Sequence, residues 1–281
     1  ALPDGKILIG GDFDKVNNVE RNKIARLNAD STLDTTFQIQ TNGTGNYFSQ
    51  IGEVYHFAVQ NDGKIIISGR FGYFVNGVQK FSLVRINSDG SIDPTFNFSL
   101  LLMDYFLTSG LGKNKPVQTP DGKILVGTTR TMVSEPVSIP LLLKPDGSRD
   151  TSFNPTIYNT QDSVTIFDLM VQPDGKILIA GRYEKHSISG STRKGFIARL
   201  NSDGTVDQSF QSPELVDKSI FVLDLRQNNQ IITASGTNQQ TIVSRLNPDG
   251  SYDFGVMQIN SAWAKVLGRD QWVALSDPCQ N

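Results

Sequence analysis

The chain has 281 residues, of which 38% are hydrophobic and 19% charged, so a sizeable core can be buried. Its formal net charge of −2 leaves no excess of basic groups to replace phosphate counterions, and we expect no nucleic-acid partner. The longest apolar run, Phe98–Leu107, is too short to cross a bilayer and contains Asp104, so we expect no membrane insertion.

Residues suited to catalysis or to metal binding are scarce. Cys279 is the only cysteine, which excludes an internal disulfide and a cysteine-based zinc site. His56 and His186 are the only histidines, and no G-x-S-x-G, H-E-x-x-H or phosphate-binding glycine motif occurs. We therefore predict that the protein is not an enzyme and has no catalytic residues and no cofactor.

Two linked motifs recur along the chain. The first has the form P-D-G-K-I-L-I-G, and the second, R-L-N-x-D-G-S-x-D-x-T-F, follows each first one. The spacing of 53 to 59 residues between copies indicates a repeat architecture. The first motif is anchored by Asp4, Asp62, Asp121, Asp174 and, in a diverged copy, Asn228. The repeats cover about 1–50, 51–109, 110–162, 163–217 and 218–259, with a partial sixth at 260–281.

Strands are predicted within each repeat, as the second copy illustrates. Residues 54–60 and 64–71 flank Asn-Asp-Gly, and residues 81–88 and 91–96 flank Asp89-Gly90. Both connections accept positive φ and favour hairpins. Each repeat therefore reads as four short strands in two hairpins, and no segment has the period of a helix.

A four-stranded unit of about 55 residues cannot bury both of its faces alone. We predict an all-β propeller of four-stranded antiparallel blades, with five near-complete repeats forming one domain over 1–281. Residues 260–268 are candidates for the first strand of repeat one, which would close a five-bladed ring. Residues 271–281 resemble a surplus second strand, which instead favours a larger ring within a longer chain. Gly10, Gly11, Gly69 and Gly181 are expected at bulges or close backbone approaches.

The two motifs together resemble the delta-60 repeats of bacterial β-propeller proteins over nearly the whole chain. The fifth copy departs from the pattern by lacking Asp-Gly-Lys, and the third has Leu142 where the others have arginine. The resemblance implies a propeller in large secreted or surface proteins, or in phage structural proteins. It implies no particular activity.

The second motif contains the most site-like pattern, N-x-D-G-x-x-D. Oxygen ligands two residues apart before a glycine are a weak indication of calcium, but the further acidic ligands of a calcium loop do not follow. We favour a structural interpretation, in which Asn and Asp bond the backbone of the turn and the last Asp caps the outgoing strand. The calcium candidates are Asn87, Asp89, Asp93, Asn201, Asp203 and Asp207.

An arginine and a phenylalanine accompany this turn in most copies. We expect the arginine to pair across the hairpin with the last Asp, as in Arg85–Asp93, while an anion site is the alternative. We expect the phenylalanine to be core between blades, with carbohydrate stacking as the alternative. The residues are Arg26, Arg85, Arg199 and Arg245, and Phe37, Phe96, Phe153 and Phe210.

The segments between the second and third strands differ from repeat to repeat. Both repeated turns are predicted at one face of the propeller, so these dissimilar segments lie at the other face, where recognition commonly occurs. We hypothesise that this variable face contacts a protein or a glycan on a surface, or other subunits of an assembly. Its candidate residues are Tyr73, Phe74, Tyr183, His186 and Arg193; His186 is predicted in a polar loop.

These observations lead to three functional hypotheses. The first is a non-catalytic scaffold or binding module of a secreted or cell-surface bacterial protein. The second is a structural component of a phage particle, located in the virion. The third, for which the sequence offers the least support, is a propeller hydrolase or lyase.

Overall fold

The computed structural model describes residues 1–40, 47–98, 115–127, 129–130, 140–155, 157, 163–187, 190–211, 215–216, 219–236, 241–253 and 257–259. These residues form strands and turns, and none of them lies in a helix, so none of them belongs to a helix that could cross a membrane. The partial sixth repeat, 260–281, lies outside the described residues.

The chain divides into two compact units, each of which contains its own strands. Unit 1 comprises Ala1–Thr128 and Leu141–Thr151, and unit 2 comprises Thr129–Pro140 and Ser152–Asn281. The single domain expected from the sequence stays a prediction.

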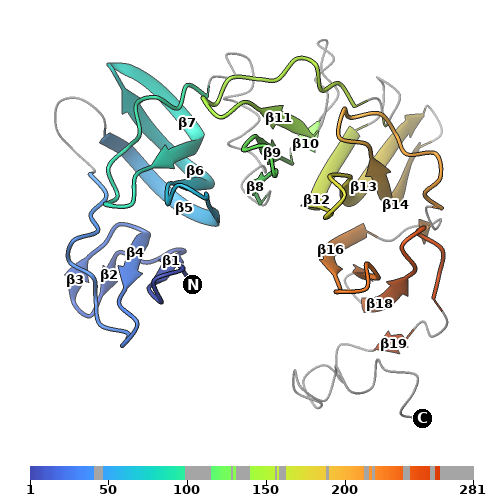
Figure 1. The fold of residues 1–281 in the computed structure, drawn as a ribbon, viewed down its shortest axis with the longest axis horizontal. Helices are drawn as coiled ribbons and strands as arrows, with labels where there is room; N and C mark the ends of the chain where they lie inside the picture. The colour runs from blue at the N-terminus through green and yellow to red at the C-terminus, as the bar shows by residue number, and fades with distance from the viewer. Residues whose placement is uncertain are drawn as a thin grey trace. The chain divides into compact units, whose positions relative to one another are not determined.

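Unit 1 contains three small antiparallel sheets of repeats 1 to 3 and a two-stranded ribbon (Figure 1). The sheets have the orders β1-β4, β5-β6-β7 and β11-β9-β8, and β2 pairs with β3. In repeats 2 and 3 the second strand therefore lies between the first and the third. The strands are β1 (Ile7–Gly10), β2 (Lys15–Val16), β3 (Val19–Glu20), β4 (Ile24–Leu27), β5 (Tyr47–Val59), β6 (Ile65–Val75), β7 (Val78–Ile86), β8 (Val117–Gln118), β9 (Ile124–Val126) and β11 (Leu141–Leu143).

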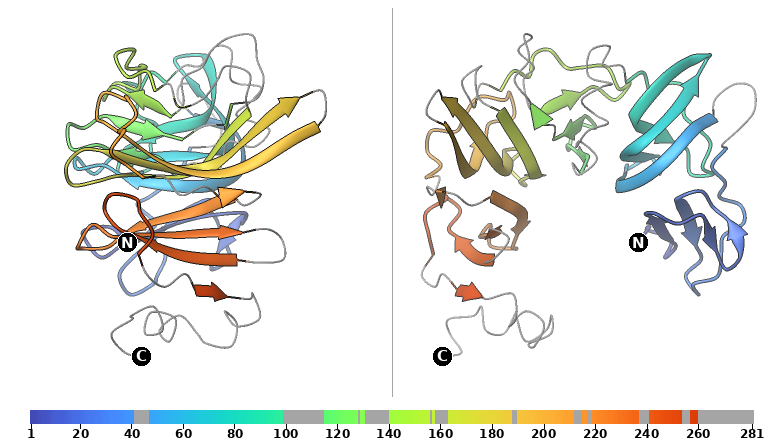
Figure 2. Two further views of the ribbon diagram at one scale, coloured as in Figure 1. Left: turned by 90° about the vertical axis from the view of Figure 1, so that its right-hand side faces the viewer. Right: turned by 180° about the vertical axis from the view of Figure 1, so that it is seen from behind.

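Unit 2 contains two antiparallel sheets, with the orders β10-β12-β13-β14-β15 and β16-β17-β18-β19. The long hairpin of β13 and β14 is drawn in yellow to gold tones in Figure 2. The strands are β10 (Thr129–Arg130), β12 (Ser163–Val171), β13 (Ile177–Ser187), β14 (Gly190–Leu200), β15 (Leu215–Val216), β16 (Ser219–Leu225), β17 (Ile231–Gly236), β18 (Thr241–Leu246) and β19 (Met257–Ile259).

The two repeated turns lie at the same end of each sheet. In repeat 2, Val59 pairs with Ile65, Ile65 with Ile86, and Ile86 with Ile92, so one row of residues passes both turns. The turn glycines have positive φ, 80° at Gly63 and 94° at Gly90, a conformation that glycine adopts without steric cost. The segments that differ between repeats therefore lie at the opposite end of the same strands.

The predicted fourth strand is reduced to one β-bridge in each described repeat, as at Ile86–Ile92 and Leu200–Val206. It stops because the next residue turns inward: the carboxylate of Asp93 accepts a hydrogen bond from the backbone N–H of Thr95. In unit 2 a short strand further along the chain, β15 or β19, pairs with the third strand. The four-stranded blade is thus not established in the form predicted.

Bulges at the first strand confirm the prediction made for two glycines. A Cβ on Gly69 would lie 2.3 Å from the carbonyl oxygen of Glu53, and one on Gly181 would lie 2.0 Å from that of Thr165. The register of the first two strands shifts beside each glycine, between Val54 and His56 and between Ile166 and Asp168. Glycine is required because the partner backbone occupies the place of a side chain.

The core consists of inward-facing aliphatic residues together with the phenylalanine that ends the second motif. In unit 1, Ile24, Ile65, Ile67 and Val84 pack with Phe37 in one buried cluster. The predicted burial of this phenylalanine is confirmed in the repeats where it occurs, since Phe37, Phe96, Phe153 and Phe210 are all buried.

Candidate functional site

The first motif and the second motif together form an ionic cluster around a buried aspartate, which we call the Lys–Arg–Asp cluster. In repeat 2 it consists of Lys64 on the turn side of β6, Arg85 on β7 and Asp93 after the bridge. Arg85 Nε and Lys64 Nζ donate to the same carboxylate oxygen of Asp93, over 2.7 and 2.8 Å. The other oxygen accepts hydrogen bonds from the backbone N–H and the hydroxyl of Thr95. The expected Arg85–Asp93 pair is therefore confirmed, with the two residues only 6% and 3% exposed.

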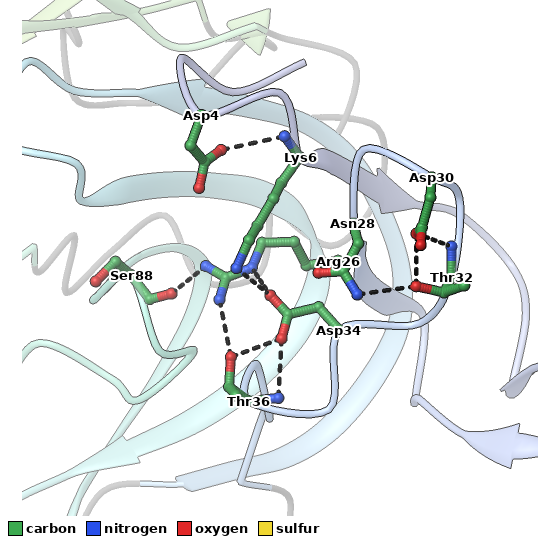
Figure 3. Close-up of polar contacts among 9 residues, drawn as sticks. All are labelled: Asp4, Lys6, Arg26, Asn28, Asp30, Thr32, Asp34, Thr36 and Ser88. Atoms are coloured by element: carbon green, nitrogen blue, oxygen red, sulfur yellow. Dashed lines mark hydrogen bonds and ion pairs between the residues drawn. The ribbon is translucent and has the colours of Figure 1, made fainter.

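The same cluster recurs in both units. Figure 3 shows it in repeat 1, where Lys6 and Arg26 donate to Asp34, and Thr36 donates to the other oxygen. In repeat 5, Gln230 replaces the lysine beside the Arg245–Asp253 pair. The cluster of repeat 4 comprises Lys176, Arg199, Asp207 and Ser209.

The cluster lowers the pKa of the aspartate in repeats 1, 2 and 4. The hydrogen bond from Lys6 is the largest cause that lowers the pKa of Asp34, and those from Ser209 and Lys176 lower the pKa of Asp207. Burial alone would raise the pKa of Asp93, but hydrogen bonds from Lys64, Thr95 and Arg85 outweigh it and lower the pKa.

Three of the arginines also reach the next repeat. Within unit 1, Arg26 donates to the carbonyl oxygen of Ser88, and Arg85 to that of Pro145. Within unit 2, Arg199 donates to the carbonyl oxygen of Pro248. Because these guanidinium groups donate their hydrogen bonds to internal partners, the geometry supports a scaffolding role over the alternative of an anion site.

The phenylalanine of the motif completes this junction. The guanidinium of Arg85 lies 4.9 Å from the centroid of the Phe96 ring. That ring covers the turn of the next repeat, where a Cβ on Gly147 would lie 2.8 Å from it. The backbone N–H of Asn97 donates to the carbonyl of Asp146 in the same turn, over 2.6 Å. The repeated residues thus join one repeat to the next within each unit.

The calcium candidates have internal partners in the structure. A carboxylate oxygen of Asp89 accepts hydrogen bonds from the backbone N–H and hydroxyl of Ser91, and the Asn87 amide donates to that hydroxyl. The equivalent bonds join Asn201 and Asp203 to Thr205, while Asp93 and Asp207 are paired with lysine and arginine. Within the described ranges no group of three or more His, Cys, Asp or Glu could hold a metal ion. These bonds match the turn interpretation, and calcium binding stays untested.

Tyr73 must be removed from the predicted binding face. It is 1% exposed, and its hydroxyl donates to the backbone carbonyl of Leu83. It is buried because the segment between the second and third strands of repeat 2 continues the hairpin of β6 and β7 and is not a loop. Alternate residues of β6 then face the core, where Tyr73 packs beside Phe48 and Phe71.

The end of the same hairpin is exposed. Asn76 and Gly77 connect β6 to β7 with φ of 50° and 78°, as expected for a type I′ turn. Val78 next to this turn is 59% exposed. Phe74 is half-buried and stacks on Tyr47, with ring centroids 5.2 Å apart.

The other three candidates lie on the hairpin of β13 and β14. In its register, Tyr183 is opposite Lys194, Glu184 opposite Arg193 and His186 opposite Ser191. The predicted polar loop around His186 is therefore wrong, because the strand pairing continues as far as Ser187–Gly190. Tyr183 is half-buried.

Three exposed or half-buried aromatic residues on the first strands were not among the site residues predicted from the sequence. Tyr55, Phe167 and Phe221 each stand seven residues before the Asp or Asn of the first repeated turn. Aligning the repeats on that turn rather than on the strands provides the signal.

Structural similarity to known proteins is weak. The chain is similar to endo-arabinase from Bacteroides thetaiotaomicron, with 8% identity, 80% of this chain and 84% of that chain covered, and a TM-score of 0.44. Puromycin hydrolase is 13% identical, with 92% of this chain and 38% of that chain covered and a TM-score of 0.44. PorZ, a bacterial surface component of the type-IX secretion system of Porphyromonas gingivalis, is 13% identical, with 84% of this chain and 31% of that chain covered and a TM-score of 0.41. No curated protein sequence matches this one.

A family model described as "Domain of unknown function (DUF5122) beta-propeller" matches four segments of the sequence, residues 2–37, 60–96, 119–153 and 172–210. Each segment begins at or just before the first repeated turn and ends at the phenylalanine of the second motif. It therefore contains the lysine and aspartate of the cluster described above. Because these segments span more than half of the residues, the chain belongs to the DUF5122 β-propeller family.

Proposed function

We propose that this protein is a non-catalytic binding module of a secreted or cell-surface bacterial protein. In this proposal the propeller is of the delta-60 type, and the ends of its second and third strands recognise a ligand on a surface. The observation that carries the proposal is the separation of repeated from non-repeated residues along the same strands.

The repeated end of each sheet is occupied with internal contacts. Its arginines and lysines bond to aspartates of the same repeat and its phenylalanines cover the next turn, as at Arg85, Asp93 and Phe96. Such residues repeat because equivalent contacts join consecutive repeats within each unit. They leave recognition to the opposite end of the strands.

That opposite end differs in chemistry between repeats. In repeat 2 the hairpin end is apolar, with Phe74 half-buried and Val78 exposed. In repeat 1 it is charged, since Lys23 bridges Asp12 and Asp14 below a turn of two asparagines. Side chains that vary on a rigid scaffold are the usual means of recognition.

The absence of catalysis is supported by the state of the buried carboxyl groups. Asp34, Asp93 and Asp207 have strongly lowered pKa values, and each is bonded to a lysine and an arginine. A carboxylate held in its ionised form by two cations is a poor general acid and a poor nucleophile.

The test uses the full chain on a glycan array, with the double variant F74S/V78S and the control V59S. Val59 is similarly apolar and 38% exposed but lies at the repeated end. We expect the wild type to bind at least one glycan, F74S/V78S to lower that binding about tenfold, and V59S to leave it unchanged.

The bound glycans are then incubated with the protein and examined for cleavage by mass spectrometry. Cleavage would contradict the proposal that the module is non-catalytic. Equal loss of binding in V59S and F74S/V78S would contradict the assignment to the hairpin ends.

A further inference from the structure

The first strands of three repeats present an aromatic residue at one equivalent position. Tyr55, Phe167 and Phe221 lie at the register shifts of β5, β12 and β16, so each occupies a β-bulge. Tyr55 is 37% exposed, Phe221 is 47% exposed and Phe167 is half-buried. Bulges commonly redirect side chains beside functional sites, and here they turn large apolar groups away from the core.

In unit 2 two of these residues form one surface. The rings of Phe167 and Phe221 have centroids 5.1 Å apart at an interplanar angle of 49°, and Val222 beside them is also exposed. Asp168 fixes the two strands, because its carboxylate accepts the backbone N–H of Leu223 on β16 over 2.8 Å. The aromatic pair thus lies on the first strands of two sheets, which this hydrogen bond joins.

An arginine adjoins the aromatic residue in repeats 2 and 4, but its charge is treated differently in the two. In repeat 2, Arg70 stands opposite Glu53 and pairs with its carboxylate over 3.7 Å. In repeat 4 the residue opposite Arg182 is Thr165, which carries no charge. Arg182 lies 5.8 Å from the centroid of Phe167, and no described residue forms an ion pair with it. Thr165 therefore gives Arg182 no carboxylate of the kind that Glu53 gives Arg70.

We propose that Phe167, Phe221 and Arg182 bind a uronic acid residue of an acidic glycan. A guanidinium matches a carboxylate with two parallel hydrogen bonds, and the aromatic rings stack on the apolar C–H face of a sugar ring. The site consists of three residues, with Val222 beside them, whereas a stable protein interface uses about 20 to 30 residues per partner, which favours a saccharide unit over a protein. This site lies in the middle of the first strands and does not rest on the hairpin ends discussed above.

The equivalent residue of repeat 2 provides the decisive variant. T165E introduces beside Arg182 a carboxylate equivalent to that of Glu53, which should form an ion pair with the arginine. T165Q adds nearly the same volume without charge. The probe is trigalacturonate, with neutral galactotriose for comparison, titrated calorimetrically into the full chain. We expect trigalacturonate binding that T165E, R182Q and F221A each weaken at least about tenfold and that T165Q changes about twofold or less. Circular dichroism of each variant verifies the β-fold.

Four results would overturn the proposal: no heat with trigalacturonate, equal affinity for galactotriose, equal loss in T165Q and T165E, or tighter binding of an acidic peptide than of trigalacturonate. The hairpin variant F74S/V78S should bind trigalacturonate as the wild type does. Failure of this site and failure of the proposed hairpin recognition are therefore distinguishable.

Discussion

Repeats 2 and 3 share their turns but differ in the residue that joins one repeat to the next. Repeat 2 has Arg85, which pairs with Asp93, covers Phe96 and reaches the carbonyl of Pro145. Repeat 3 has Leu142 at the equivalent position, where it is buried. There Lys123 bridges the carboxylates of Asp121 and Asp150, over 3.2 and 3.1 Å.

The difference separates two roles that one motif combines. The lysine–aspartate pair closes a repeat on itself and survives in repeat 3, whereas the arginine adds bonds to the following repeat. The chain passes between the two compact units after Thr128, Pro140 and Thr151, all within the repeat that lacks this arginine. The repeated aspartate thus makes contacts within its own repeat, and the arginine adds a contact to the following repeat.

Replacing Arg85 with leucine converts repeat 2 to the pattern of repeat 3 and should have the largest effect. It leaves the buried Asp93 with only Lys64 as a cationic partner and removes the bond to Pro145. Breaking a buried ion pair by removing one partner costs about 3 to 5 kcal/mol. Urea-induced unfolding measures the change in the free energy of unfolding, and a loss below about 1 kcal/mol would refute this role.

Acid should destabilise the wild type through the same clusters. The folded-state pKa of Asp34, Asp93 and Asp207 lies below the ordinary value, so their stabilisation is complete above about pH 5 and is lost as pH falls below about 4. The variant D93N should lose less stability between pH 5 and 3 than the wild type. Parallel slopes in urea titrations at several pH values would contradict this expectation.

Two glycine substitutions separate packing at the junction from backbone strain. Gly147 and Gly63 have nearly equal positive φ, 83° and 80°, but only the former faces the Phe96 ring. G63A should cost about 1 to 2 kcal/mol for the left-handed conformation, and G147A about 1 to 3 kcal/mol more for the clash. Thermal unfolding of both variants measures the difference, which should vanish if Phe96 does not cover the turn.

The smallest effect is expected from S91A in the exposed turn of repeat 2. The hydroxyl of Ser91 bonds only to the neighbouring Asp89 and Asn87, so its loss should cost about 0.5 to 1.5 kcal/mol. A cost as large as that of R85L in the same urea assay would show that the turn, rather than the arginine, dominates the junction.

The sequence was sufficient to predict the repeated parts of the fold. Periodic turns located the first, second and third strands, and the spacing of Arg85 and Asp93 predicted their pairing. The bulges at Gly69 and Gly181 followed from glycine where other residues would be favoured. These features are local, and their recurrence along the chain reinforces the inference.

The parts predicted wrongly depend on interactions that residue patterns do not express. The side chain of Asp93 ends the fourth segment after one bridge, although its neighbours have strand-like character. Tyr73 was assigned to a segment that differs between repeats and His186 to a polar loop, yet strand pairing continues through both. The face of the sheet on which Tyr73 lies is set by register, which a single bulge reverses.

The central claim is that one arginine joins two consecutive repeats, and hydrogen exchange in R85L tests it most directly. Residues 93–97 of repeat 2 and 144–149 of repeat 3 should both exchange faster than in the wild type, because the bonds from Arg85 to Asp93 and to Pro145 are lost together. Faster exchange confined to residues 93–97, with 144–149 as protected as in the wild type, would contradict the claim.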